Sequence, residues 1–248
     1  MLGIIGGTGL THLANLEIIR RQIVRTPYGE PSGALIFGRI KDHEVVFLAR
    51  HGYGHSIPPH EVNYRANMWA LHSQGVQRIV SVATVGGIHS DCVPGAIVIP
   101  DQIIDYTWGR KSTYFVANGK PVTHVDFTEP YCETMRQQAM RAATLTGEAH
   151  LDSGVYGATQ GPRLETAAEI NRMERDGATI VGMTGMPEAV LARELGQCYA
   201  AICVVANHAA GRGSSAHAIH YQEIEAVLNQ AMGRVRGILE HLVEIDAD

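Results

Sequence analysis

Short apolar runs rich in β-branched residues alternate along this chain with longer stretches whose apolar residues recur at helical spacing. Near-continuous apolar runs of this kind are typical of strands that are buried on both faces of a sheet. The predicted strands are Leu2–Ile5, Ala34–Phe37, Val45–Ala49, Ile79–Ala83, Ala96–Ile99, Gly154–Ala158, Thr179–Met183 and Tyr199–Ala206.

The longer amphipathic stretches predict helices at Asn63–Ser73, Pro130–Thr146, Glu165–Arg175, Pro187–Leu195 and Tyr221–Leu242. Pro187 suits the first position of its helix, and the Glu188 carboxylate suits the positive end of that helix dipole. The alternation predicts an α/β protein with a mixed, mostly parallel twisted sheet flanked by helices. We expect a single domain over residues 1–248, with ligands bound beyond the strand ends, where the loops emerge.

Composition narrows the function classes. The net charge of −5 argues against nucleic acid or an acidic membrane as the main partner. We expect no membrane span, because no run reaches about 18 apolar residues, and no signal peptide, because no basic residue precedes the apolar start. The four widely spaced cysteines predict reduced, mostly buried thiols in a cytoplasmic protein.

Four predicted strand ends carry residues that suit an anion. Gly6–Gly9 and Thr84–Gly87 offer exposed amides and hydroxyls, Arg50 offers a planar fork of donors, and Thr184 precedes a helix start. Each has an ordinary structural explanation as well: a tight turn, a surface salt bridge or a helix cap. Their recurrence at four strand ends favours a phosphate site.

The histidines at 51, 55 and 60 raise the question of zinc. Their spacing is loose, no acidic partner lies at metal-site spacing, and the segment is not expected to be a helix that would align them. The Gly and Pro residues around them instead predict a mobile loop over the active site. We expect no metal and no cofactor, with inorganic phosphate as a co-substrate.

Five segments together resemble the trimeric purine nucleoside phosphorylases, and more closely their methylthioadenosine phosphorylase branch. They are IIGGTGL (4–10), ARHGYGHSIPPHEVNYRANMWAL (49–71), DQIIDYTWGR (101–110), TQGPRLETAAEI (159–170) and GMTGMPEAVLARELG (182–196). The resemblance runs nearly end to end. It implies the single-domain nucleoside phosphorylase fold, usually as a homotrimer, and phosphorolysis of a purine nucleoside through an oxocarbenium-like transition state.

The resemblance also assigns residues. The phosphate-binding set is Thr8, Arg50, His51, Ala83, Thr84 and Thr184. The nucleoside-binding set is Met183, Leu164, Glu165, Asn207, His208, Ala209, His220, Tyr221 and His124, and the last resembles a residue that enters the neighbouring subunit's active site. The catalytic roles fall to Asn207, Glu165 and Arg50.

Two of these residues indicate the base. The adenine-specific members have Asp at the position of Asn207, whereas the pair Asn207 and Glu165 resembles that of 6-oxopurine phosphorylases. The amide can donate to the six-position oxygen, and the carboxylate can accept the ring N–H that adenine lacks. Glu165 is also explained as a helix N-terminal carboxylate, and Asn207 as a left-handed turn residue.

The 5′ group is the next question. Tyr221 is aligned with an apolar residue of the methylthio-specific members, although a shift of one residue would place His220 there. The expected reaction is therefore S-methyl-5′-thioinosine plus phosphate to hypoxanthine and 5-methylthioribose 1-phosphate. A general inosine/guanosine phosphorylase is the alternative, followed by a methylthioadenosine phosphorylase. A nucleosidase that uses water, a metal-dependent hydrolase and a non-catalytic nucleoside-binding protein are the rivals from other classes.

Overall fold

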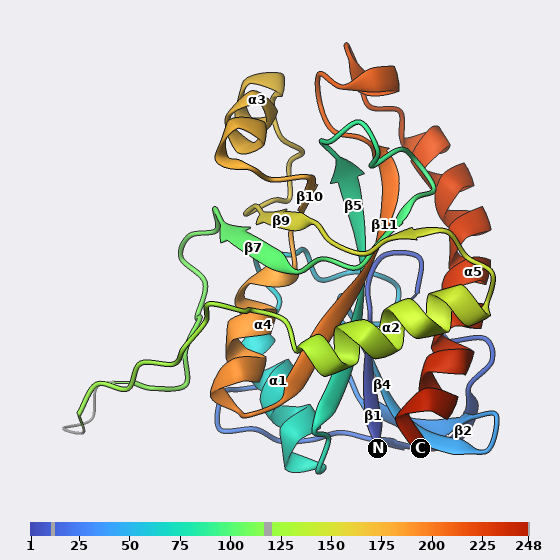
Figure 1. Ribbon diagram of the computed structural model, residues 1–248. Coiled ribbons are helices and arrows are strands. Elements are labelled where there is room, and N and C mark those ends of the chain that lie inside the picture. The colour runs from blue at the N-terminus through green and yellow to red at the C-terminus, as the bar shows by residue number, and fades with distance from the viewer. Residues whose placement is uncertain (11–12, 117–120, 248) are drawn as a thin grey trace.

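The computed structural model describes residues 1–10, 13–116 and 121–247 (Figure 1). The strands within this part are β1 (Leu2–Gly6), β2 (Glu17–Gln22), β3 (Leu35–Ile40), β4 (His43–Ala49), β5 (Arg78–Gly87), β6 (Ile97–Val98), β7 (Gln102–Asp105), β8 (His150–Leu151), β9 (Val155–Ala158), β10 (Ile180–Gly182) and β11 (Cys198–His208). The helices are α1 (Tyr64–Ser73), α2 (Glu133–Leu145), α3 (Ala167–Asp176), α4 (Gly185–Glu194), the short 3-10 helix η1 (Gly213–Ser215) and α5 (Tyr221–Ala247).

In the described residues, all the strands belong to one sheet. Its main order is β2-β3-β4-β1-β5-β10-β9-β7. Off this path, β11 pairs with β5 and with β6, and β6 pairs with β8. Six strand pairs are parallel and four are antiparallel. The α/β class and the mixed, mostly parallel sheet are therefore confirmed.

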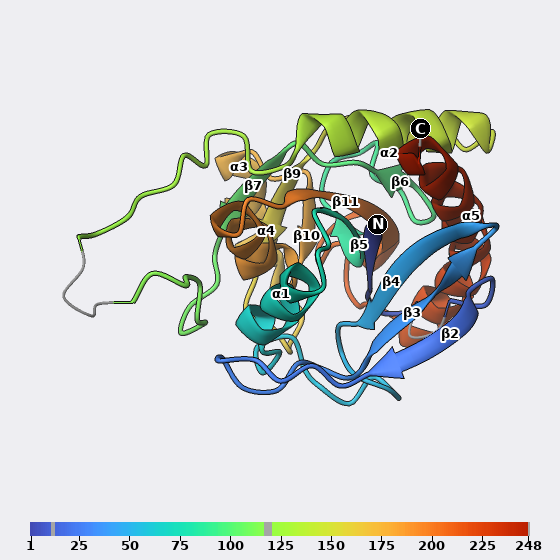
Figure 2. The same cartoon turned by 90° about the horizontal axis from the view of Figure 1, so that it is seen from below.

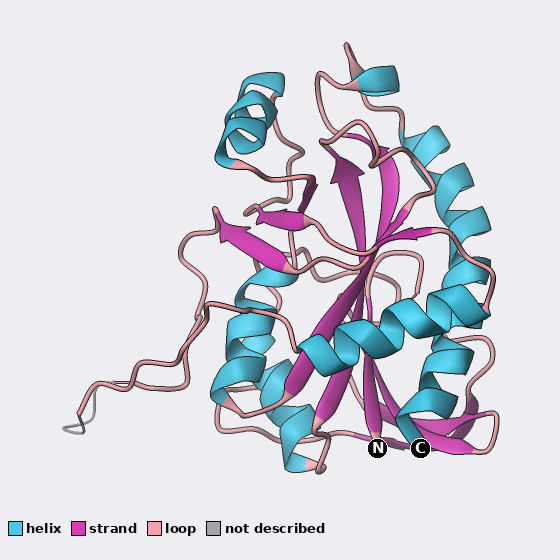
Figure 3. Ribbon diagram, viewed as in Figure 1, coloured by secondary structure: helices cyan, strands magenta, loops and turns pink. Residues whose placement is uncertain are grey.

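Helices cover both faces of the sheet (Figures 2 and 3). Side chains alternate between the faces along each strand, so Val80 and Ile202 pack with α2 and α5, while Ile79 and Tyr199 pack with α1 and α4. This double cover explains the continuous apolar runs of the sequence. In the described part of the chain, no helix combines the length and apolarity that a bilayer crossing requires.

On one side, β5 has different strand partners along its length. Its first half pairs with β1 as far as Ser81, and its end pairs with β10 at Gly86 and Gly87. β11 follows the other side of β5 throughout, with a bulge between Val205 and Asn207. Residues 82–85 therefore have a strand partner on one side only, and β1 and β10 separate beside them.

The eight predicted strands are present, but β2, β7 and β8 were missed. β2 is a charged edge strand whose residues are exposed or half-buried, so it has no apolar run. β8 has only two residues, and the four residues of β7 are half-buried or exposed.

α4 starts two residues before the predicted start at Pro187, and this first turn is irregular. The helix begins at Gly185, and Met186 and Pro187 have non-helical dihedral angles inside it. Glu188 is buried rather than exposed to solvent at a helix end, and its role is described with the site.

The prediction of four reduced cysteines was wrong. Cys132 and Cys198 form a disulfide with a Cα–Cα distance of 5.1 Å, while Cys92 and Cys203 are free and buried. The Cys132 amide donates to the carbonyl of Tyr199 at 2.8 Å, which holds the start of α2 beside the start of β11. The two cysteines are 66 residues apart, so their spacing gave no signal.

A long segment between β7 and α2 leaves the body of the molecule (Figures 1 and 2). It carries His124, which is exposed, and it includes the exposed side chains of Trp108 and Val122.

Candidate active site

A cavity of about 480 Å³ opens where β1 and β10 separate beside β5. Its walls come from the ends of β1, β4, β5, β10 and β11, from the segment 55–59, from the segment before α3, and from the start of α5. The lining residues are Thr8, Arg50, His51, His55, Ser56, Ile57, Pro58, Pro59, Ala83, Thr84, Val85, Gly86, Pro162, Leu164, Glu165, Val181, Gly182, Met183, Thr184, Asn207, Ala209, Ile219, Tyr221 and Ile224.

The cavity collects most of the residues singled out in the sequence. Those that line it are Thr8, Arg50, His51, Ala83, Thr84, Thr184, Met183, Leu164, Glu165, Asn207, Ala209 and Tyr221. His208, His220 and His124 do not line it. His208 lies just past the bulge, with Nδ1 3.1 Å from the Ser214 hydroxyl, and His220 immediately precedes α5.

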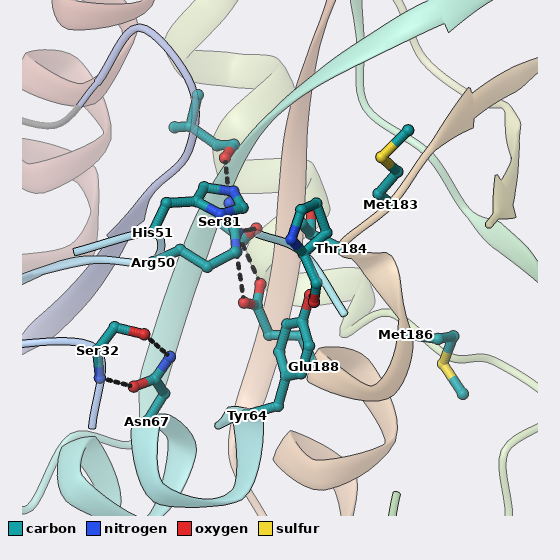
Figure 4. A network of polar contacts seen from close by, with 12 residues as sticks. Ser32, Arg50, His51, Tyr64, Asn67, Ser81, Met183, Thr184, Met186 and Glu188 are labelled. Carbon is teal, nitrogen blue, oxygen red and sulfur yellow. Dashed lines mark hydrogen bonds and ion pairs between the residues drawn. The ribbon is translucent and has the colours of Figure 1, made fainter. Parts of the chain in front are cut away.

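Arg50 forms the deepest part of one end. Its side chain is fully buried, and Nε and Nη2 donate to the two carboxylate oxygens of Glu188 at 2.7 and 2.9 Å (Figure 4). Nη2 also donates to the Ser81 hydroxyl at 2.6 Å, and Nη1 donates to the Val82 carbonyl at 3.0 Å. These bonds leave one of the two Nη1 hydrogens for an anion in the cavity. The surface salt bridge that could have explained Arg50 is excluded by this burial.

The Glu188 carboxylate has a further hydrogen-bond donor besides Arg50. The Tyr199 hydroxyl donates to its Oε2 at 2.8 Å, so both carboxylate oxygens are occupied. A buried ion pair requires such additional bonds to offset the loss of hydration. Burial alone would lower the pKa of Arg50, but the charge and hydrogen bonds of Glu188 raise it above its usual value. Arg50 is therefore a permanently charged, buried cation.

His51 is a neutral group beside that cation. Burial, and then the charge of Arg50, lower the pKa of His51 to about 4. Its Nδ1 lies 2.8 Å from the carbonyl of Ile57, so Nδ1 carries the proton and donates. In the neutral ring, Nε2 is then a hydrogen-bond acceptor.

The turn after β1 places Thr8 at the same end. A Cβ at Gly7 would lie 2.6 Å from the Val82 carbonyl oxygen and 2.8 Å from Arg50 Nη1, so only glycine permits this approach. The Thr84 hydroxyl donates to the Thr8 carbonyl at 3.2 Å, and Thr8 Oγ1 lies 3.4 Å from Nε2 of His55. The turn explanation of this motif is therefore confirmed, and Thr8 lies on the cavity wall, where the anion-site prediction requires it.

Thr184 supplies a further hydroxyl. It is the residue before α4, but its side chain makes no capping hydrogen bond. Its amide donates to the Tyr156 hydroxyl at 3.3 Å. The capping explanation is thus excluded, and the hydroxyl is available to the cavity that it lines.

The opposite end of the cavity carries Glu165 and Asn207. Glu165 precedes the α3 cap, which Thr166 and Glu169 form as a capping box, and Oε1 of Glu165 accepts the Thr159 hydroxyl at 2.6 Å. Glu165 therefore lies just before the N-cap of α3 and does not itself cap the helix, and its carboxylate is held by Thr159. Asn207 is a strand residue at the β11 bulge, not a left-handed turn residue, and its Nδ2 donates to the His208 carbonyl at 2.6 Å.

The segment before α3 lies close to the residue that follows β10. Gly161 has φ of +62°, and a Cβ there would lie 2.5 Å from Sδ of Met183. Glycine at this position lets the segment that carries Leu164 and Glu165 lie directly against Met183.

Sequence reasoning missed three contributors. Glu188 was assigned to a helix dipole, whereas its carboxylate holds Arg50; Thr159 and His55 were not assigned to the site. A buried carboxylate four residues after Thr184 gives no sequence signal, because only the fold brings it to Arg50. The resulting arrangement offers a cation with hydroxyls at one end and an amide with a carboxylate at the other.

Comparisons with known proteins identify the family of this chain. Residues 1–244 match the profile of the phosphorylase superfamily. The chain is 50% identical over 240 residues to a probable S-methyl-5′-thioinosine phosphorylase from Pseudomonas syringae, covering 97% of both chains. It is 45% identical over 243 residues to the 6-oxopurine nucleoside phosphorylase of Pyrococcus furiosus, covering 96% of this chain and 90% of that one.

A solved structure has the same fold. The methylthioadenosine phosphorylase of Schistosoma mansoni in complex with adenine superposes with a TM-score of 0.94 at 34% identity, covering 100% of this chain and 92% of that chain. The profile match, the identities and the superposition together show that this chain belongs to the phosphorylase superfamily.

Proposed function

We propose that this protein uses inorganic phosphate to cleave a 6-oxopurine nucleoside, with S-methyl-5′-thioinosine as its best substrate. The products are hypoxanthine and 5-methylthioribose 1-phosphate. The observation that carries the proposal is one cavity lined both by Arg50, which bonds to Val82, and by the pair Asn207 and Glu165, with Asn207 beside Gly86 farther along β5. The names of the relatives that are about half identical to this chain support it.

The chemistry follows from the charges. As the glycosidic bond breaks, the anomeric carbon gains positive charge, and the base leaves with the electron pair. A phosphate oxygen forms the new bond to that carbon, with Arg50, Thr8 and Thr184 as its orienting groups. Holding the phosphate in place lowers the entropic part of the barrier. Hydrogen phosphate gives up its proton to solvent as the new C–O bond forms, and the leaving base takes one proton from solvent on its imidazole nitrogen, so the protons balance. The Asn207 amide oxygen accepts a hydrogen bond from that N–H.

His51 suits a phosphate that still carries a proton. Because its Nδ1 donates to the Ile57 carbonyl, Nε2 can accept a hydrogen bond from a protonated phosphate oxygen. Arg50 meanwhile balances the charge of the anion. We therefore assign hydrogen phosphate as the bound form.

The base end favours hypoxanthine over adenine. The Asn207 amide donates to the six-position oxygen, and the Glu165 carboxylate accepts the ring N–H. The Thr159 hydroxyl donates to one carboxylate oxygen of Glu165, which leaves the other oxygen to accept the ring N–H of the base. Adenine would leave these groups without matching partners, and each unsatisfied group would weaken binding by about 1–3 kcal/mol.

The 5′ group is assigned to Tyr221, because Tyr221 lines the cavity and His220 does not. Its ring is an apolar surface with one polar tip, which suits a methylthio group. A general inosine/guanosine phosphorylase is the alternative, favoured by the relatives named 6-oxopurine nucleoside phosphorylase.

We further propose a cytoplasmic enzyme that needs no metal or cofactor. The sugar phosphate product is charged and would be retained in the cell. Reducing conditions in the cytoplasm disfavour disulfides such as Cys132–Cys198. Cell fractionation followed by thiol labelling would show both where the protein is and whether these two cysteines are reduced. Activity that survives a chelator is expected.

The first prediction concerns assembly. We propose a homotrimer in which the projecting segment brings His124 to the neighbouring cavity. The exposed Trp108 and Val122 side chains on that segment support a partner surface. Light scattering should therefore give a mass near three chains, and a monomer with full activity would refute this arrangement.

A second prediction tests phosphate binding. Thr184→Val removes a hydroxyl at nearly constant volume, so the KM for phosphate should rise about 10-fold with little change in nucleoside binding. Arg50→Lys loses the planar fork, and kcat/KM for phosphate should fall on the order of 100-fold. Thr144→Val, on the exposed side of α2, is the control. Phosphate-independent hydrolysis by the wild type, or unchanged phosphate dependence in both site variants, would sink the assignment.

The base pocket gives a third prediction. Asn207→Asp places a carboxylate against the six-position oxygen and offers the adenine amino group an acceptor. The ratio of kcat/KM for 6-aminopurine over 6-oxopurine nucleosides should rise by roughly 10-fold or more. A wild type that already prefers adenosine or methylthioadenosine contradicts the pocket assignment before any variant is made.

The fourth prediction concerns the 5′ group. The wild type should cleave methylthioinosine with a kcat/KM roughly 10–100-fold above that for inosine, the scale for a small apolar group in a pocket. Tyr221→Ala should narrow this gap, while Tyr221→Phe, which keeps the ring, should preserve it. If inosine is the better wild-type substrate, the general 6-oxopurine phosphorylase replaces the methylthio assignment.

A further inference from the structure

Arg110 ends the motif DQIIDYTWGR, to which the proposed function gives no role. It is half-buried at the root of the projecting segment and does not line the cavity. We infer that Arg110 is a positioning residue that fixes the base-binding and the sugar- and phosphate-binding segments of the active site relative to each other. This inference rests on the proposed function and deepens it.

The hydrogen bonds of Arg110 reach both segments. Nη2 donates to the carbonyls of Thr159 and Gln160 at 3.1 and 2.8 Å. Nη1 donates to the carbonyls of Met183 and Met186 at 2.7 and 2.6 Å. Nε donates to Oε1 of Gln160 at 3.1 Å. The five N–H groups of the guanidinium therefore all have oxygen acceptors, divided between two loops that are more than 20 residues apart in the sequence.

Three of these four carbonyls, those of Thr159, Gln160 and Met183, belong to residues outside the helices and strands. Thr159 and Gln160 follow the end of β9, and Met183 follows the end of β10. Pro187 has no N–H with which to donate to the Met183 carbonyl four residues earlier. Buried carbonyls require donors, and Arg110 supplies them from outside both segments.

Each segment carries half of the site. Thr159 holds Glu165 through its hydroxyl, so the carbonyl and the side chain of Thr159 join Arg110 to the base-binding carboxylate. Met183 and Thr184 line the sugar and phosphate part, and Figure 4 shows them with Met186 on the same stretch of chain. The pairing of β9 with β10 and the bond from the Thr159 amide to the Gly182 carbonyl join the two segments at their strand ends. Arg110 fixes them beyond that point, where they carry the side chains of the site.

A third contact extends to the loop over the phosphate end. Nη1 of Arg110 lies 3.4 Å from the Tyr64 hydroxyl, and the guanidinium carbon lies 5.4 Å from the centre of that ring. The Tyr64 hydroxyl donates to the carbonyl of Pro59, which lines the cavity.

Steady-state kinetics of Arg110→Lys and Arg110→Ala test the inference. Lysine keeps the charge but loses the planar fork, and alanine loses both. We expect KM for nucleoside and for phosphate to rise and kcat/KM to fall on the order of 100-fold, the scale for misplaced reacting groups. Added guanidinium, below denaturing concentrations, should restore part of the activity of Arg110→Ala. Arg141→Ala on the exposed side of α2 is the matched control, with unchanged kinetics and no response to guanidinium.

Circular dichroism and thermal unfolding keep the outcomes distinct. A purely structural role would lower the folded fraction, and hence kcat, while the KM values of the folded enzyme stay the same. Wild-type KM values in folded Arg110→Lys overturn the inference, as does a loss in folded Arg110→Ala that guanidinium leaves unchanged. If Arg110→Ala does not fold, Arg110→Lys decides alone. A wild type without phosphorolysis refutes the proposed function instead, so the two failures are separate.

Discussion

The buried ion pair between Arg50 and Glu188 is the constraint on which the rest of the site depends. Removing one partner would leave a charge unpaired in the interior, which costs about 3–5 kcal/mol. β4, β5, α4 and β11 must therefore stay in register, because they supply Arg50, Ser81, Glu188 and Tyr199. The pair presents one fixed cation to the cavity, because the guanidinium is buried and held by its partners.

The sheet provides the space that this cation faces. β1 and β10 pair with different parts of β5, so the strand is open on one side over residues 82–85. Parallel strands bring their ends to one edge, and the antiparallel β10 brings Met183 and Thr184 to them from another direction. The base end is built differently: Glu165 lies in a connecting segment, and Asn207 lies at a strand bulge.

Much of this could be predicted from the sequence, for identifiable reasons. Strands covered on both faces leave continuous apolar runs, and Gly7 and Arg50 lie directly after such runs. The same logic could not find β2, whose exposed residues lack a buried face, or the disulfide between Cys132 and Cys198. Contacts between distant segments, such as Glu188 with Arg50 and Thr159 with Glu165, depend on the completed fold and have no local signature.

The two ends of the cavity also differ in how freely they can vary through evolution. A substitution at Glu188 or Ser81 disturbs a closed set of buried bonds and endangers folding as well as catalysis. Asn207 and Tyr221 line the cavity outside that set of bonds, so a substitution there can reshape the cavity wall while Arg50 keeps its partners. One part of the cavity wall is thus tied to the folding of the chain, and the other is free to change without it.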